Sequence, residues 1–134
     1  MIKERNMLKK KIVAVAMVAT LLCGSVAGAE TETQKGTSLN KTVVCTLDCI
    51  FSLGGLDVGT ADTSWDGKKD YLVSTELYQK QNCFDDFHRI GASSGKKNAY
   101  FRGSVKGVWE FKSKHYTVKT DGTSKYQVLS LTDW

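Results

Sequence analysis

The sequence predicts an all-β protein, an antiparallel sandwich or a small barrel, formed by residues 41–134. Apolar and polar residues alternate with a period of two, which is typical of a strand with one buried face. In the C-terminal part, the apolar set of this alternation is Ala99, Phe101, Gly103 and Val105. Turn signals separate the short segments, and the strongest is the Asp-Gly pair within residues 120–123. Several such segments over about 95 residues match the size of a single sandwich domain.

Residues 1–29 predict a cleaved secretory signal peptide. A basic start ends at Lys9-Lys10-Lys11, residues 12–23 are almost wholly apolar, and Ala27-Gly28-Ala29 supplies small residues before the cleavage point. The apolar run is shorter than the ~20 residues that cross a bilayer, so no stable membrane span is expected in the mature form. We therefore expect a secreted, extracellular protein, and association with the cell surface is left open.

The mature chain is close to charge balance. The full sequence has 19 basic and 14 acidic residues, but residues 1–29 contain five of the basic residues and one acid. Residues 30–134 therefore keep 14 basic and 13 acidic residues, a net charge of +1. Overall charge gives no reason to expect nucleic acid as a partner.

The first half of the mature chain alternates strands with glycine-rich breaks. Residues 30–40 are polar and lack aromatic side chains, so we expect a flexible lead-in. A strand is predicted from Lys41 to about Phe51, ending before Gly54-Gly55. A weaker strand follows over residues 56–62, and residues 63–70 predict a loop with a second Asp-Gly turn.

The middle of the chain allows two interpretations. Residues 70–81 predict a strand from their β-branched and aromatic content. A helix over residues 76–90 competes with two strands joined near Gln81-Asn82, because one helical stripe would collect Leu77, Tyr78, Gln81, Phe84 and His88. We prefer the two strands. Residues 91–97, which contain two glycines and two serines, predict a loop.

Residues 98–131 predict a β-meander with an irregularity near its centre. The alternation breaks because Tyr116 and Val118 are apolar on what had been the polar face. A bulge near Lys114 would explain the change, as would a strand that changes neighbours. His115 lies at the break, and we interpret it as a hydrogen-bonded structural histidine.

Cys45, Cys49 and Cys83 are the disulfide candidates, because export places a protein in an oxidising setting. In an extended strand Cys45 and Cys49 share a face but lie ~13 Å apart, which is too far for a bond between them. Either of them could bond Cys83 and leave one thiol over. Three free thiols are the alternative.

No metal, cofactor or catalytic site is predicted. A zinc site built from the three cysteines and His88 is disfavoured, because structural zinc sites usually present paired cysteines on a turn. Calcium is disfavoured because the spacing of a calcium loop is not matched by Asp57, Asp62, Asp66 and Asp70. Cys83 with His115 as nucleophile and base lacks an accompanying oxyanion motif. We therefore expect a protein that is not an enzyme.

A late aromatic strand, residues 107–118, carries His115 and precedes the glycine turn at residues 121–123 and a final strand. Together with the aromatic segment at residues 76–80, this C-terminal half resembles small, uncharacterised secreted proteins of Gram-positive, clostridial-type bacteria. The resemblance implies an immunoglobulin-like β-sandwich and implies no ligand.

These observations predict a noncatalytic extracellular or cell-surface interaction module, whose partner is an extracellular protein or a cell-wall component. Sandwiches commonly bind through loops, which here are residues 64–69 and 91–97. Trp65 is the candidate ligand-binding residue as an exposed aromatic side chain, with burial under its loop as the competing interpretation. A secreted bacteriocin or toxin-like polypeptide is the alternative function, but a net charge of +1 does not favour it.

Overall fold

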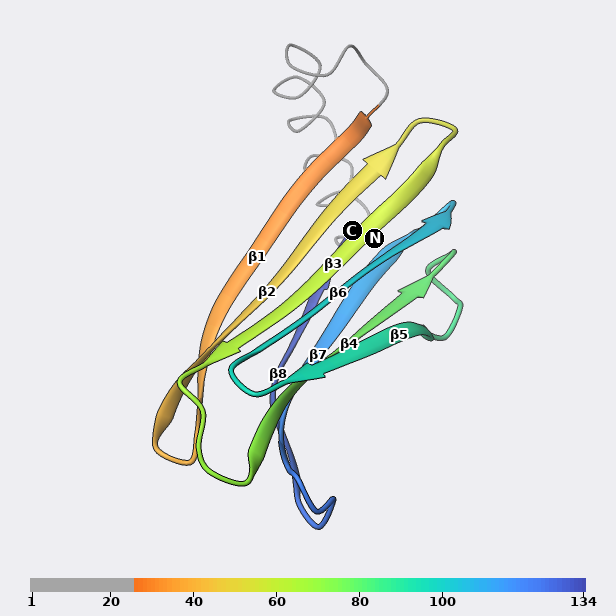
Figure 1. Cartoon of the computed structure of the whole chain (residues 1–134). Coiled ribbons are helices and arrows are strands. Elements are labelled where there is room, and N and C mark those ends of the chain that lie inside the picture. The colour runs from red at the N-terminus through yellow and green to blue at the C-terminus, as the bar shows by residue number, and fades with distance from the viewer. Residues whose placement is uncertain (1–25) are drawn as a thin grey trace.

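The structure is a computed structural model that describes residues 26–134, so most of the predicted signal peptide lies outside the described residues. Within this range the chain forms antiparallel strands in two layers (Figure 1). The predicted all-β sandwich is confirmed. The strands are β1 (Val26–Ser38), β2 (Lys41–Ser52), β3 (Leu56–Trp65), β4 (Tyr71–Lys80), β5 (His88–Gly95), β6 (Asn98–Lys106), β7 (Glu110–Lys119) and β8 (Lys125–Asp133).

The two sheets have the strand orders β1-β2-β3-β6 and β5-β4-β7-β8. The connections β3–β4, β5–β6 and β6–β7 therefore cross from one sheet to the other, whereas the other connections are hairpins within a sheet. In an immunoglobulin constant domain the first, second, fifth and fourth strands share a sheet. Agreement with the immunoglobulin-like prediction is thus limited to the two-layer architecture.

The core lies between the sheets and follows the predicted period of two. Alternate residues of β2, from Val43 to Phe51, are buried. The rings of Phe51 and Phe111 meet across the layers with their centroids 5.7 Å apart. A Cβ atom on Gly59 would lie 2.7 Å from Phe111 Cδ1, so the close approach of β3 to this ring requires a residue without a side chain.

Residues 30–40 are not the predicted flexible lead-in. Residues 30–38 belong to β1, which pairs with β2 from Glu30 opposite Cys49 to Ser38 opposite Lys41. This edge strand is stabilised by backbone pairing, and its side chains at Thr31, Thr33, Gln34, Lys35 and Thr37 are exposed, so its polar composition does not oppose strand formation. Cleavage after Ala29 would shorten β1 at its start and keep this pairing.

Two further predictions concern the chain around β5. The competing helix over residues 76–90 is absent, because β4 runs to Lys80 and the chain turns through residues 81–87 into β5. The preferred two-strand interpretation is therefore confirmed. The predicted loop at residues 91–97 is wrong for residues 91–95, which continue β5 and pair with β4. A small residue is needed there, because a Cβ atom on Gly91 would lie 2.3 Å from the ring of Phe101.

The predicted C-terminal meander is only partly correct. β7 and β8 form the expected hairpin, but β6 pairs with β3 in the other sheet rather than with β7. Gly107, with φ of +71°, lies at the crossing between the sheets. Next to it, Asp57 is buried and accepts hydrogen bonds from the backbone N–H groups of Ser52 and Val108, both at 2.7 Å.

The break in alternation corresponds to a bulge in the β7–β8 pair. Opposite His115 lies Leu129, but opposite Tyr116 lies Gln127, so the extra residue is Val128 on β8. The irregularity lies near Lys114, as predicted, but the extra residue belongs to β8, the strand that pairs with β7.

Candidate functional site

Four connections meet toward one end of the sandwich, at the lower part of Figure 1. The β3–β4 connection, residues 66–70, is hydrogen-bonded to its three neighbours. Gly67 O accepts from Lys41 Nζ at 2.7 Å, beside the β1–β2 turn. At the two ends of the connection, Trp65 N donates to Lys97 O at 2.9 Å, and Thr120 N donates to Asp70 O at 2.8 Å. The β3–β4 connection therefore holds the four loops together, and we call this region the loop end.

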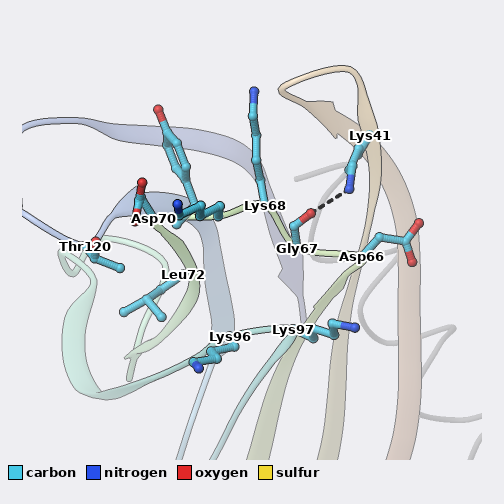
Figure 2. A pocket seen from close by; sticks show the side chains of 11 residues that line it. Lys41, Asp66, Gly67, Lys68, Asp70, Leu72, Lys96, Lys97 and Thr120 are labelled. Carbon is cyan, nitrogen blue, oxygen red and sulfur yellow. Dashed lines mark hydrogen bonds between the residues drawn. The ribbon is translucent and has the colours of Figure 1, made fainter.

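The loop end surrounds a pocket of about 640 Å³. This volume falls in the range of ~300–1,000 Å³ that is common for small-ligand sites. Figure 2 shows side chains from separate connections around it, together with the hydrogen bond from Lys41 to Gly67. The lining carries five lysines and two carboxylates, namely Lys41, Lys68, Lys69, Lys96, Lys97, Asp66 and Asp70.

Backbone conformation places two of these lysines at the tip of the β3–β4 connection. Gly67 has φ of +87° and Asp70 has φ of +64°, both in the left-handed region that glycine and aspartate tolerate best. Tyr71 N donates to Lys68 O at 3.1 Å and closes the turn. Lys68 and Lys69 therefore lie in a hydrogen-bonded turn rather than in a flexible segment.

Positive charge is concentrated at the loop end. All five lysines are exposed, and none of them has an ion-pair partner within residues 26–134. With the two aspartates, the pocket lining has a net charge of +3, whereas the other residues of the 30–134 chain hold nine basic and eleven acidic groups. The near-neutral net charge of residues 30–134 thus includes a local excess of three positive charges at this pocket.

Trp65 is not the exposed contact that the sequence suggested. Its side chain is 3% exposed, and its ring meets Tyr71 edge-on with centroids 6.4 Å apart. Trp65 continues the inward-facing series of β3, in step with Ala61 and Thr63. The competing interpretation, burial under the loop, is therefore confirmed, and Trp65 supports the β3–β4 connection from the core side.

The disulfide candidates are free thiols, so the predicted bond is wrong. Cys45 and Cys49 face the core from β2, whereas Cys83 is exposed in the connection between β4 and β5. Burial raises the pKa of the Cys45 thiol to about 12 and raises the pKa of Cys49 still more. Both thiols are therefore protonated and pack as small apolar groups.

His115 is a buried, hydrogen-bonded residue, as predicted. Its Nδ1 lies 2.7 Å from Thr63 Oγ1, and its Nε2 lies 2.7 Å from Ser113 Oγ. Burial lowers the pKa of His115 to about 4, so the imidazole is neutral near pH 7. Thr63, Ser113 and His115 each have an exposed fraction of 0%, so solvent does not reach the imidazole or the two hydroxyls.

The metal sites considered from the sequence are not assembled. No group of three or more His, Cys, Asp or Glu side chains in residues 26–134 is placed to hold a metal ion. In the zinc set, Cys45 and Cys49 are in the core, whereas Cys83 and His88 are exposed. In the calcium set, the Asp57 carboxylate is buried and bonded to backbone N–H groups.

A second polar cluster lies on the outer face of the β5-β4-β7-β8 sheet around Glu76, which is 8% exposed. The Glu76 carboxylate accepts from Tyr78 Oη at 2.9 Å and lies 3.4 Å from Arg89 Nη2 and 3.7 Å from Lys125 Nζ. Burial acts to raise the pKa of Glu76, but hydrogen bonds from Tyr78 and Tyr116 and the two cations bring its pKa below the usual value. These groups satisfy one another, so the cluster links all four strands of this sheet.

The sequence predicted the two main loops of the pocket but not that they lie side by side with two further connections. Residues 64–69 and 91–97 were the predicted binding loops, and each contributes a lysine pair to the pocket. Lys41 and Thr120 were not predicted, because only the tertiary fold brings their connections beside the other two. The signal that was available is the repetition of Lys-Lys in two separate turns, at residues 68–69 and 96–97.

No known family model matches this chain, and no curated protein matches it significantly. In the part of the chain described, residues 26–134, no helix has the length and apolar character needed to span a membrane. Fold and site together define the class: a small antiparallel β-sandwich with a lysine-lined pocket between the loops at one end.

Proposed function

We propose that this protein is a secreted, noncatalytic interaction module that binds an extracellular or cell-surface partner at its loop end. The observation that carries the proposal is the union of four connections around one lysine-lined pocket. Binding sites on sandwiches are commonly built from loops that a rigid scaffold positions. Here three hydrogen bonds to the β3–β4 connection supply that rigidity.

The chemistry of the side chains supports binding rather than catalysis. The pocket is lined by lysines, aspartates, a threonine hydroxyl and the side chains of Tyr71 and Leu72, which recognise charge and shape. The pair with the geometry of a nucleophile and a base, Ser113 and His115, is fully buried. The leader-like residues 1–29 support export.

Export is tested by expressing the full chain in a secreting bacterial host and sequencing the N-terminus of the product in the culture fluid. The expected first residue is Glu30, because the small residues end at Ala29. Product that stays inside the cells with residues 1–29 attached would contradict export.

Binding is tested by incubating the exported protein with washed cell envelopes and measuring the bound fraction. The loop-end variant carries Lys68→Gln, Lys96→Gln and Lys97→Gln. The matched control variant loses the same charge outside the pocket, through Arg102→Gln, Lys106→Gln and Lys114→Gln. We expect the loop-end variant to bind about tenfold more weakly or worse and the control variant to bind like the wild type. Equal binding by all three proteins would refute the proposed site, and growth inhibition of neighbouring bacteria would favour the toxin-like alternative.

A further inference from the structure

The lysine-lined pocket continues into a second hollow. This hollow, of about 360 Å³, shares Asp66 and Lys97 with the pocket and extends along Thr42, Val44 and Ser64. Thr42, Val44 and Ser64 alternate with buried residues along β2 and β3, so they lie on the outer face of the β1-β2-β3-β6 sheet. A path therefore runs from the loop end onto the sheet face. Such a path suits an elongated ligand better than a compact one.

The positive groups along this path suit phosphate. The pocket's cations are all lysines, whose ammonium groups act as point charges and commonly bind phosphate. The lysines come from separate connections, so they can contact successive charges on one chain. None of them is neutralised by an ion-pair partner in residues 26–134.

The remaining groups along the path suit hydroxyls. Asp66 and Asp70 are exposed carboxylates that accept hydrogen bonds from hydroxyls, and Thr42, Ser64 and Thr120 can donate or accept. A ligand that carried negative charge alone would leave the two carboxylates without a favourable contact. A chain that alternates phosphates with hydroxylated units would use both sets of groups.

We propose that the loop end and the adjoining hollow bind a linear polymer of phosphate-linked, hydroxylated units, a polyol-phosphate or sugar-phosphate chain. This inference rests on the proposed function, because it names the partner class for the same site. The ligand lies across both hollows, with phosphates beside the lysines and hydroxyls beside Asp66 and Asp70. Electrostatic attraction supplies much of the affinity, so binding weakens as salt concentration rises.

The test is a titration of the exported protein with poly(glycerol phosphate), in which binding is measured by isothermal calorimetry or tryptophan fluorescence. We expect saturable binding that falls with salt, glycerol 3-phosphate monomer that binds at least about tenfold more weakly, and a similar loss in the loop-end variant. The control variant, which has the same net charge as the loop-end variant, is expected to bind like the wild type.

Three comparisons separate this ligand class from others. Equal affinity for polyglutamate would show a general preference for polyanions and would overturn the proposal. Tighter binding to vesicles containing phosphatidylglycerol than to the soluble chain would overturn it in favour of a lipid headgroup. If the loop-end lysines are needed for envelope binding but poly(glycerol phosphate) does not bind, the ligand class is wrong and the proposed function stands. If envelope binding does not need the loop-end lysines and poly(glycerol phosphate) does not bind, both the ligand class and the proposed function are rejected.

Discussion

Replacing His115 by glutamine should flatten the dependence of stability on pH. The His115 pKa is lowered from 6.5 to about 4 by burial, so the native state resists protonation more than the unfolded chain does. For a base with a lowered native pKa, the stabilisation is complete above the unfolded pKa of 6.5 and is lost as pH falls toward 4. The full shift corresponds to about 3 kcal/mol, of which about 2 kcal/mol is lost between pH 7 and pH 5.

Urea denaturation at pH 7 and pH 5 measures this loss directly. Wild type should lose about 2 kcal/mol more than His115→Gln over this interval, whatever the stability of the variant at pH 7. His88 is exposed, so His88→Gln serves as the matched control and should keep the wild-type loss. A direct NMR titration of the two imidazoles avoids any dependence on the fold of the variant. A His115 pKa near 6.5, or an equal loss in His115→Gln, would refute the buried neutral imidazole.

Three further predictions concern packing and accessibility. Gly59→Val should destabilise the fold by about 1–3 kcal/mol, because its side chain would overlap an aromatic ring across the core; an unchanged urea midpoint would contradict the closeness of the sheets. Thiol labelling of the folded exported chain should modify Cys83 alone, with Cys45 and Cys49 reacting only after unfolding; a single reactive thiol in the unfolded, unreduced chain would reveal a disulfide. Trp65→Ala should destabilise by about 3–5 kcal/mol through a cavity, and a variant as stable as wild type with reduced envelope binding would restore Trp65 as an exposed contact.

Local patterns were sufficient wherever one face of a strand is buried. The predicted strand from Lys41 places Cys45 and Cys49 on one face, and in β2 that face is the one turned to the core. The Asp121-Gly122 pair predicted the β7–β8 hairpin, because that turn needs a residue with positive φ and Gly122 has φ of +76°.

Local patterns failed where long-range pairing decides the structure. β1 is polar because it is an edge strand, and composition alone does not distinguish such a strand from a flexible segment. Nearness in sequence suggested that β6 pairs with β7, but β6 completes the sheet of β3 instead. The loop end depends on the same long-range order, because Lys41 and Lys97 are neighbours of the β3–β4 connection only after the sheets have assembled.

The most direct test of the loop-end site is a map of amide NMR shifts during titration with poly(glycerol phosphate). We expect the largest changes in residues 41–44, 64–72 and 96–98 and at Thr120, with little change around Lys106. Changes concentrated on the outer face of the β5-β4-β7-β8 sheet, or spread evenly over the surface, would contradict it.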